Sequence, residues 1–362
     1  MTLSDVARDA PRIRSVANHI AAISRKPVQF MEFCGSHTHA LLRYGIRDML
    51  PATITMRSGP GCPVCVTSAS DIDLAIAIAG MSDVIVATYG DLVRVPGTNG
   101  SLERARARGA DVKVIYSALD ALQIAAQHPE RQVILIGIGF ETTAPTVAAA
   151  IIAASRHRLS NFRVLPLLKL TPPVMAALLQ LGEVHIDGIL CPGHVSVITG
   201  MEPYRAIPGR FNVGCVVSGF EPLDMLQAID MLVEQAEAGT PAVANAYERA
   251  VSEQGNEVAR NVMNQVFAPC DAEWRGLGLV SASGLRLRPE YQDFDATAIY
   301  QPHVARSSEP FGCRCGDVLR GSALPQDCPL FARVCTPDNP VGPCMVSHEG
   351  ACAAHFSYAI PT

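Results

Sequence analysis

Short apolar runs alternate with polar loops along the first two thirds of the chain. Seven runs lie between Pro27 and Pro222, at 28–33, 53–56, 84–87, 133–136, 164–168, 189–190 and 213–217. Each ends in a loop rich in glycine, proline, cysteine or histidine, and an alanine-rich helical stretch usually follows. Strands that are apolar throughout are typical of a parallel sheet with helices on both faces. The pattern therefore predicts βαβ units and an α/β fold.

The helical stretches of this pattern are expected at 40–50, 69–79, 144–155 and 174–181. We expect two parallel sheets, which divide near Glu130 into one α/β domain at 28–130 and a second at 131–222. Beyond Leu223 the pattern changes, and the spacing predicts an amphipathic helix at 224–238 and a second helix at 240–266. Beyond Pro269 the chain is rich in glycine, proline and cysteine and has few apolar runs. Such a segment is expected to need a metal to become ordered.

Composition narrows the class of protein. The chain has 362 residues, of which 49% are hydrophobic and 17% charged, so two or three domains with substantial cores are expected. A formal charge of −5 and the lack of a Lys/Arg run argue against a nucleic-acid surface. No segment is apolar for long enough to span a bilayer, and the N-terminus lacks the apolar core of a signal peptide. We therefore expect a cytoplasmic protein, whose clustered cysteines bind metal or do redox chemistry rather than form disulfides.

The first candidate site is the loop that begins at Cys34, between an expected strand and an expected helix. His37 and His39 follow it three and five residues later. A helix N-terminus favours the thiolate, so the pKa of Cys34 is expected to be lowered. Thiolate and imidazole together are ligands for Zn or Fe(II). The alternative is an ordinary polar turn with solvated histidines.

The second candidate is Cys62-Pro-Val-Cys65, which also follows a strand and precedes a helix. This placement suits thiol–disulfide exchange, with the N-terminal Cys62 as the activated thiol. It also suits half of a zinc site, but the chain has no second C-x-x-C pair to complete one. Zinc shared with Cys34 and His37 is the competing interpretation, and we favour redox chemistry.

The third candidate is a group of six cysteines near the C-terminus. A [4Fe–4S] cluster needs four thiolates, and sharp turns at proline and glycine let the chain wrap around it. We assign the four ligands to the widely spaced members Cys328, Cys335, Cys344 and Cys352. Cys313 and Cys315 could be ligands, a redox pair or structural residues. The three remaining cysteines, Cys191, Cys215 and Cys270, are expected to be small buried residues.

Two further candidates, Glu141 and His194, stand just past expected strand ends. Helix capping and turn formation are the alternative roles for both. Loops at the carboxyl ends of parallel strands meet at one edge of a sheet, so all these groups can converge. The chain has no Gly-x-x-x-x-Gly-Lys loop and no full dinucleotide fingerprint, so ATP hydrolysis and dinucleotide binding are not expected.

Taken together, the motifs resemble the HypD family of hydrogenase maturation factors. They are Phe-Cys-Gly-Ser-His-Thr-His at 33–39, Gly-Pro-Gly-Cys-Pro-Val-Cys at 59–65, Gly-Phe-Glu-Thr-Thr at 139–143, Pro-Gly-His-Val-Ser at 192–196 and the cysteine-rich stretch 313–352. The resemblance covers almost the whole chain. Ala332 and Ser36 depart from the residues that are usual in the family, and neither is a proposed ligand.

The resemblance implies a scaffold with redox activity on which the Fe(CN)2CO unit of [NiFe]-hydrogenases is assembled. The family acts with the chaperone HypC and with HypE, which delivers cyanide as a thiocyanate. The resemblance places the iron at Cys34, a redox pair at Cys62 and Cys65, and a [4Fe–4S] cluster in the C-terminal cysteines. It also implies that residues 1–27 and 223–362 form a smaller iron–sulfur domain that includes the N-terminal helix.

Within this function, His37 and His39 are expected to orient or protonate ligands on the iron. We expect a monomer that works inside a hetero-complex. Two other classes of protein remain open from the sequence. One is a free-standing thiol–disulfide oxidoreductase coupled to an iron–sulfur cluster, and the other is a zinc-binding adaptor without redox activity.

Overall fold

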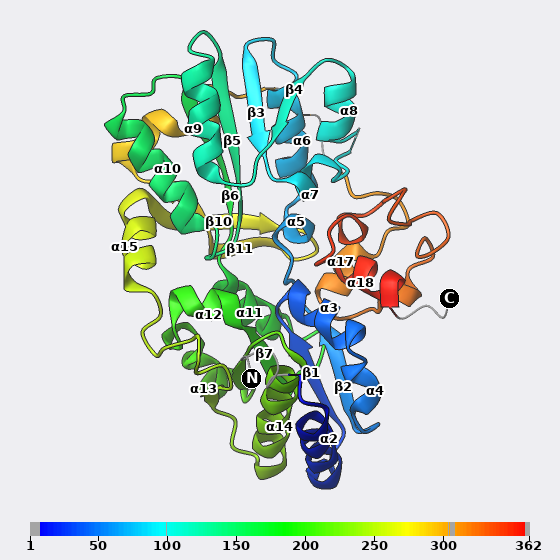
Figure 1. The fold of residues 1–362 in the computed structure, drawn as a ribbon. Helices are drawn as coiled ribbons and strands as arrows, with labels where there is room; N and C mark the ends of the chain where they lie inside the picture. Colours follow the sequence, from blue (N-terminus) through cyan, green and yellow to red (C-terminus); the bar gives the residue numbers. More distant parts are fainter. Residues whose placement is uncertain (1–7, 99, 303, 305–307, 359–362) are drawn as a thin grey trace.

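The computed structural model describes residues 8–358 apart from 99, 303 and 305–307. Residues 1–7 of the expected N-terminal segment therefore lie outside the described residues. The chain forms two parallel sheets, one above the other, and a cysteine-rich module (residues 308–358) at the side where they meet (Figure 1). The predicted α/β class with two parallel sheets is confirmed.

The first sheet, at the bottom of Figure 1, has five parallel strands in the order β2-β1-β7-β8-β9. Its strands are β1 (Val28–Glu32), β2 (Ile54–Ser58), β7 (Gly188–Pro192), β8 (Gly214–Ser218) and β9 (Val243–Asn245). The second sheet has four parallel strands in the order β4-β3-β5-β6. These are β3 (Val84–Thr88), β4 (Asp111–Val114), β5 (Gln132–Gly139) and β6 (Phe162–Leu168).

The expected division near Glu130 is wrong. Strands β3 and β5 lie on either side of this residue in the sequence, and they are hydrogen-bonded neighbours in one sheet. The chain leaves the first sheet after β2, builds the whole second sheet, and returns to the first sheet at β7. The hydrophobic pattern predicts where strands lie but carries no information on which strands pair. The passage of the chain from the first sheet to the second and back therefore could not be predicted from the sequence.

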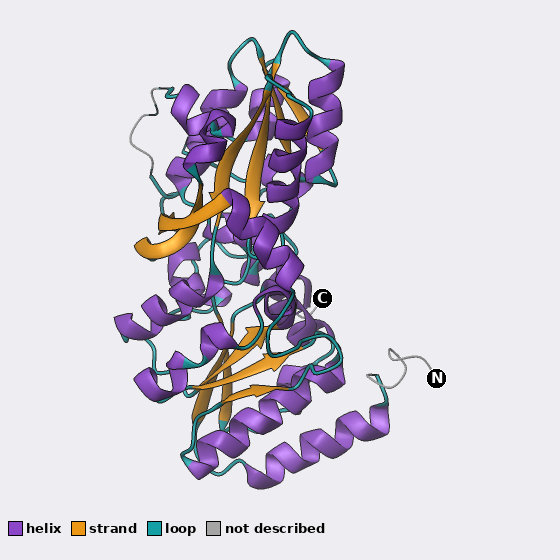
Figure 2. Ribbon diagram, turned by 90° about the vertical axis from the view of Figure 1, so that its left-hand side faces the viewer, coloured by secondary structure: helices purple, strands orange, loops and turns teal. Residues whose placement is uncertain are grey.

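Helices cover both faces of each sheet (Figure 2). Those of the first sheet are α2 (Ala10–Ile23), α3 (Gly35–Arg43), α4 (Ile46–Met49), α12 (Gly193–Thr199), α13 (Ala206–Phe211) and α14 (Pro222–Ala238). Those next to the second sheet are α5 (Pro63–Val66), α6 (Ala69–Ala79), α7 (Gly90–Val93), α8 (Leu102–Ala107), α9 (Ala118–Gln127) and α10 (Ala144–Arg156). Helix α11 (Thr171–Leu181) lies lower in Figure 1, where it packs against α13. The helix expected at 40–50 begins earlier and breaks at Gly45, whose φ of 63° is left-handed.

The N-terminal helix α2 packs against α14, the first helix of the 223–362 stretch. Apolar residues of α14 such as Leu226 and Ile229 form one core with Leu190 and Val216 of the sheet. Both helices therefore belong to the body of the first sheet. The expected grouping of the N-terminal helix with the chain beyond Leu223 holds for α2 and α14, but this pair covers the sheet and does not build a separate domain with the cysteines.

An antiparallel hairpin follows the first sheet. It consists of β10 (Phe267–Trp274) and β11 (Gly278–Leu287). The long helix predicted at 240–266 is wrong, because strand β9 and a loop fill most of it and only α15 (Glu257–Val266) is helical. The polar loop satisfies its backbone locally, for example through Asn245, whose side chain donates to Val251 O at 2.9 Å.

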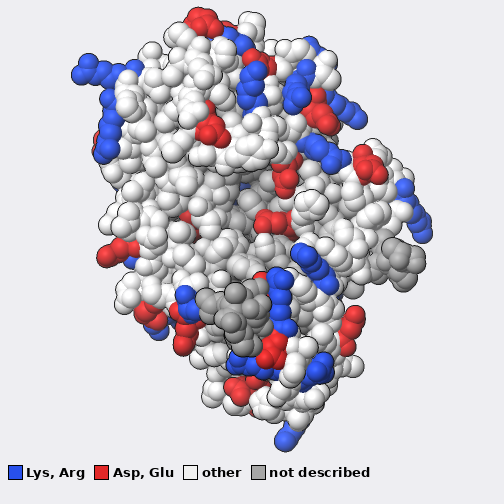
Figure 3. All heavy atoms as spheres, viewed as in Figure 1, with Lys and Arg blue, Asp and Glu red and all other residues white. Residues whose placement is uncertain are grey.

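The cysteine-rich module has little regular structure. It holds the short helices α17 (Cys315–Leu319) and α18 (Ala351–Tyr358) and 3₁₀ turns at Pro325–Asp327 and Pro343–Met345, and α16 (Ala296–Ile299) precedes it. Contacts join it to both sheets, because α18 packs on α3 and the turn at Pro343–Met345 packs on α5. None of the helices in the described part of the chain is long and apolar enough to cross a membrane. On the face shown in Figure 3, basic and acidic side chains are interspersed rather than gathered by sign.

Candidate functional site: three groups of cysteines

The Cys34 loop and the Cys62 loop touch each other. Cys34 follows β1 and Cys62 follows the neighbouring strand β2, so both loops leave the same edge of the first sheet. Gly61 is the contact, because a Cβ on it would lie 2.4 Å from the Cα of Cys34. The N–H of Gly35 also donates to the carbonyl of Gly61 at 3.2 Å. A residue with a side chain could not stand at position 61 without pushing the two loops apart.

Cys34 is buried, with only 1% of its surface exposed. Its Sγ lies 3.7 Å from Nδ1 of His194, in the first turn of α12, which directly follows β7. Burial, and then the charge of Glu349, raise the pKa of the Cys34 thiol to about 12, although the N–H groups at the start of α3 act in the opposite direction. The expected lowering of this pKa is therefore wrong. Burial raises the pKa of Cys34 by more than the N-terminus of α3 lowers it. The thiol is therefore protonated at neutral pH unless a metal binds it.

His194 is neutral beside this thiol, because burial lowers its pKa to about 4. Burial and the neighbouring His194 also lower the pKa of His37 to about 4. His37 Nε2 lies 3.0 Å from the carbonyl oxygen of Gly219, so Nε2 carries the proton and donates it. Its buried Nδ1 has no hydrogen-bond partner among the described residues. The rings of both histidines pack on Phe220, with centroids 4.8 and 5.4 Å away.

His39 does not join this group. Its Nε2 lies 3.1 Å from the hydroxyl of Tyr358 in α18. It lines a separate cavity of about 370 Å³ with Arg43, Glu221 and other residues. His39, a residue of α3, therefore contacts the end of the cysteine-rich module rather than the Cys34 group.

Cys62 and Cys65 form a close pair, with their Sγ atoms 2.6 Å apart and both thiols free. Burial is the largest single influence on the pKa of both thiols, and it raises the pKa of Cys62. For Cys65, hydrogen bonds with Cys344 and Cys62 outweigh burial and lower the pKa to about 5. The two shifts have opposite directions, and they favour Cys65 rather than the expected Cys62 as the more acidic thiol of the pair.

A second close pair joins the module to the first. The Sγ atoms of Cys315 and Cys344 lie 2.7 Å apart. Cys344 also hydrogen-bonds to Cys65, whose Sγ lies 3.7 Å from the carbonyl oxygen of Pro343. Four sulfur atoms thus form a continuous chain from Cys62 through Cys65 and Cys344 to Cys315. Neighbouring sulfurs at such distances are poised for thiol–disulfide exchange.

The module holds four other cysteines, one of which, Cys352, also hydrogen-bonds to Cys344. They are Cys313, Cys328, Cys335 and Cys352. Burial and the charges of neighbouring thiols, which include Cys328 and Cys352, raise the pKa of Cys313 and of Cys335. Four soft thiolates that influence one another, in a module with little core of its own, suit an iron–sulfur cluster. The donor set of the module therefore fits such a cluster.

Glu141 lies away from the sulfur atoms. Its carboxylate accepts hydrogen bonds from the backbone N–H of Thr171 at 2.8 Å and from the hydroxyl of Thr171 at 2.9 Å. Burial raises the pKa of Glu141 to about 7. The structure gives it the capping role that was the alternative in the sequence, since it ties the start of α11 to the end of β5. Cys191 and Cys215 are buried in the first sheet as expected, whereas Cys270 is only partly buried.

Glu349 is a residue that the sequence did not single out. It accepts a hydrogen bond from Ser36 Oγ at 2.8 Å, and so connects the module to the start of α3. It also lines a cavity of about 680 Å³ with Cys62 and Asp91. This cavity lies past the ends of β3 and β5, where the strand order of the second sheet reverses. Only its position next to His348, within the cysteine-rich stretch 313–352, could have drawn attention to it.

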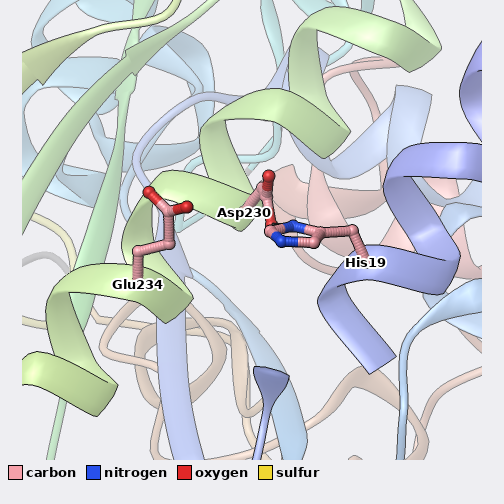
Figure 4. A group of neighbouring side chains, drawn as sticks. All are labelled: His19, Asp230 and Glu234. Atoms are coloured by element: carbon pink, nitrogen blue, oxygen red, sulfur yellow. Dashed lines mark hydrogen bonds and ion pairs between the residues drawn. The ribbon is translucent and has the colours of Figure 1, made fainter. Parts of the chain in front are cut away.

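One cluster of possible metal ligands lies elsewhere, on the outside of the first sheet. His19 of α2 and Asp230 and Glu234 of α14 have ligand atoms within 4.8 Å of one another (Figure 4). The ring Nδ1 of His19 lies 2.9 Å from Asp230, and this contact raises the pKa of the histidine. An ion pair between the two helices accounts for the arrangement, and all three groups are far from the cysteines in the fold.

Comparison with known proteins identifies relatives along the whole chain. The family profile described as "HypD: Hydrogenase formation hypA family" matches residues 11–359. The chain is 48% identical to the hydrogenase maturation factor HypD2 of Bradyrhizobium diazoefficiens, over 99% of this chain and 97% of the relative. It is 47% identical to HypD of Rhizobium leguminosarum (99% and 96%) and 43% identical to HypD of Escherichia coli (96% and 93%). This chain therefore belongs to the HypD family of hydrogenase maturation factors.

Proposed function

We propose that this protein is the scaffold on which the Fe(CN)2CO unit of a [NiFe]-hydrogenase is assembled, with a HypC-type chaperone and a HypE-type cyanide donor as partners. Iron is the cargo in this proposal. The observation that carries it is the contact between the Cys34 loop and the Cys62 loop at Gly61. A thiol that can hold a metal thus lies next to a thiol pair that can supply electrons.

Cys34 and His194 form the cargo site. The Cys34 thiol is protonated in the free protein because its pKa is about 12, and a metal that binds the sulfur displaces this proton. The neutral His194, with Nδ1 at 3.7 Å, stands where it can accept the proton or ligate the same metal. Phe220 keeps both His37 and His194 in place, and burial excludes competing water.

The Cys62/Cys65 pair supplies the two electrons that release cyanide from a thiocyanate. The reaction is R–S–CN plus two thiols, giving R–SH, a disulfide and HCN. The S–C bond breaks, the two cysteine sulfurs are oxidised to a disulfide, and their protons go to the leaving thiolate and to cyanide. Cys65, whose pKa is about 5, is the thiolate that starts this step.

The cysteine-rich module restores the thiols. Cys344 hydrogen-bonds to Cys65 and forms its own pair with Cys315, so a disulfide at Cys62/Cys65 can exchange with this second pair. A [4Fe–4S] cluster in the module would supply electrons one at a time. Because Cys344 hydrogen-bonds to Cys65 outside the module, as well as to Cys315 and Cys352, we assign it to the relay and assign the cluster ligands to Cys313, Cys328, Cys335 and Cys352. Cys313 thus replaces Cys344 in the set expected from the sequence.

The Cys34 site distinguishes this proposal from a generic thiol–disulfide oxidoreductase. An oxidoreductase needs the sulfur chain alone, whereas Cys34 stands outside the chain with an imidazole as its partner. The proposed ligand set consists of four cysteines and no histidine, which favours iron–sulfur ligation over a catalytic zinc site. The free thiols throughout the described chain support a cytoplasmic protein, which we expect to act as a monomer within the hetero-complex.

The double variant Cys62→Ala with Cys65→Ala tests the redox part of the proposal. It should abolish maturation of a hydrogenase, while infrared spectra show that the complex with the HypC-type chaperone lacks bound cyanide. Iron should still be retained, since Cys34 is intact. Normal maturation by the double variant would contradict the proposal.

A further inference from the structure

The tip of the β10–β11 hairpin lies between the helices that carry the two thiol pairs of the sulfur chain. We call residues 275–277 the hairpin tip, Cys62 with Cys65 the first pair, and Cys344 with Cys315 the second pair. Helix α5 carries the first pair, and α17 begins at Cys315. The hairpin strands contact β6, α11 and α15, whereas the tip contacts α5 and α17 (Figure 1). The tip can therefore set the distance between these two helices.

Arg275 attaches the hairpin tip to α5 and to the cysteine-rich module. Its backbone N–H donates to the carbonyl of Val66 at 2.8 Å, and its Nε donates to the carbonyl of Thr67 at 3.0 Å. These two carbonyls stand at the C-terminal end of α5. The guanidinium is buried, with 1% of the side chain exposed, and its Nη1 pairs with Glu309 of the module. One residue thus connects the helix of the first pair to the module.

Gly276 brings the hairpin tip against α17. A Cβ on Gly276 would lie 2.6 Å from the Cα of Gly316, the residue after Cys315. The backbone of Gly276 has a φ of 80°, and its carbonyl accepts a hydrogen bond from Nη1 of Arg320, which follows α17 directly. Two backbones this close leave no room for a side chain at position 276. A side chain there would push α17, and Cys315 with it, away from the tip.

The two cysteines of the second pair are held by different elements. Cys344 lies in the turn at Pro343–Met345, which packs on α5, and a carbonyl oxygen of this turn lies 3.7 Å from Sγ of Cys65. Cys315 instead stands at the start of α17, with its Sγ 2.7 Å from that of Cys344. Cys344 thus stays beside the first pair, while the contact of the hairpin tip with α17 keeps Cys315 within reach of it.

We propose that the hairpin tip promotes the second step of thiol exchange between the two pairs, in which Cys315 closes the second pair and Cys65 is released. Gly276 and Arg275 are the positioning residues for this step. The inference rests on the proposed function, in which the second pair reduces the first. An attacking thiol must lie close to the sulfur that it attacks, so a contact that fixes α17 acts directly on this step.

The exchange moves two electrons from the second pair to the first pair. Cys344 attacks the disulfide of the first pair at Cys65, so a Cys344–Cys65 bond forms and Cys62 is released. Cys315 then attacks Cys344, so the second pair becomes a disulfide and Cys65 is released. The two protons of the second pair pass to the two released sulfurs.

The charge of Arg275 favours the release of Cys65. Burial raises the pKa of Cys65, hydrogen bonds with two other thiols lower it, and the guanidinium of Arg275 lowers it further. A sulfur with a lower pKa is a better leaving group. Arg275 therefore supports the same step as Gly276, by charge as well as by attachment of the tip.

The test uses the full-length, cluster-loaded protein with one disulfide among these four thiols. Anaerobic equilibration with a glutathione redox buffer, acid quenching and mass spectrometry of linked peptides compare the two species that share Cys344. Gly276→Ala should raise the ratio of the Cys65–Cys344 bond to the Cys315–Cys344 bond by about tenfold or more, because the new Cβ pushes Cys315 away. Gly278→Ala is the matched control, with a φ of 71° and nothing within 4 Å of its Cβ, and its ratio should match the wild type.

Further variants separate the contact with α17 from strain in the turn. Gly316→Ala places a Cβ 3.0 Å from the Cα of Gly276 without a left-handed backbone, so it should raise the same ratio by a smaller factor. Arg275→Met should raise the ratio as well, and Arg275→Lys, which keeps the charge, should raise it less than Arg275→Met does. The visible absorbance of the cluster shows for each variant that the module stays folded.

The inference alone is wrong if Gly276→Ala has the ratio of the wild type, or if Gly278→Ala raises the ratio as much as Gly276→Ala does. If Gly276→Ala loses the cluster, the comparison of Gly316→Ala with the wild type decides in its place. The proposed function fails instead if the wild type forms a disulfide within the first pair but no bond to Cys344, since the second pair then cannot reduce the first.

Discussion

The Cys34 site and the sulfur chain show two opposite uses of a buried cysteine. Cys34 lies beside a neutral imidazole, and burial raises the pKa of its thiol to about 12 although the start of α3 also hydrogen-bonds to it. Cys65 is equally buried, yet its pKa falls to about 5 because hydrogen bonds with two other thiols outweigh burial. Burial alone therefore does not set the reactivity of a thiol, and the neighbouring groups decide it.

The difference in pKa between Cys34 and Cys65 suits the two roles proposed for these neighbouring sites. A protonated thiol beside an imidazole is inert until a metal arrives, which suits a site that must hold iron. A thiolate within a row of sulfurs exchanges readily, which suits electron supply. Gly61 lets the two lie side by side without sharing a ligand. Variants that affect one site and leave the other intact test this comparison.

The largest effect is expected from removing the metal-binding thiol. Cys34→Ala should abolish iron retention in the complex with the HypC-type chaperone, because no other thiol lies in the Cys34–His194 site. The visible absorbance of the cluster should stay at the wild-type level. Iron analysis and infrared spectra of bound CN and CO measure the outcome. Cys270→Ala, on the distant hairpin, is the control and should retain iron, whereas CN and CO bands in Cys34→Ala would refute the assignment.

A pair of variants separates ligands from relay cysteines within the module. Cys313→Ser should lose the visible absorbance and the paramagnetic signal of the cluster, because it removes one of four thiolates. Cys344→Ser should keep both signals and lose maturation, because it interrupts the chain to Cys65. Absorbance and electron paramagnetic resonance of anaerobically purified protein give the answer. The opposite result, with the cluster lost in Cys344→Ser and kept in Cys313→Ser, would restore the ligand set expected from the sequence.

Gly61→Ala tests whether the two sites must touch. The new Cβ would meet the Cys34 backbone at 2.4 Å, so the loops must move apart, at a cost of roughly 1–3 kcal/mol in unfolding free energy. Maturation should fall by roughly tenfold or more, because the cargo and the electron source are no longer aligned. Gly209→Ala, in α13 with nothing within 4 Å, is the matched control and should gain up to about 1 kcal/mol. Full activity in a stable Gly61→Ala protein would show that the contact is not needed.

Much of the fold and part of the candidate site could be predicted from the sequence. Every loop with unusual residues does follow a strand, and the helices 69–79 and 224–238 were placed within two residues. The failures have physical reasons. Pairing between distant strands leaves no local pattern, so the crossing between the sheets was missed. The pKa of Cys34 was misjudged because sequence shows the helix terminus but not the burial. The pairing of Cys315 with Cys344 depends on how the proline-rich loops fold, and spacing alone does not fix that.

The smallest effect concerns how the free energy of unfolding changes in acid. It distinguishes the buried imidazole of His194, beside Cys34, from an exposed histidine. The pKa of His194 is about 4 in the folded protein and about 6.5 in an unfolded chain. Between these values the unfolded state binds more protons, so the free energy of unfolding decreases as the pH falls from about 6.5 to about 4, by ~3 kcal/mol at most. His194→Gln removes this contribution and should lose less stability between pH 7 and pH 5 than the wild type in anaerobic urea unfolding. The exposed His157→Gln should follow the wild type. If His194→Gln also follows the wild type, the imidazole is not buried as a neutral group, and Cys34 lacks the proton acceptor that separates it from the sulfur chain.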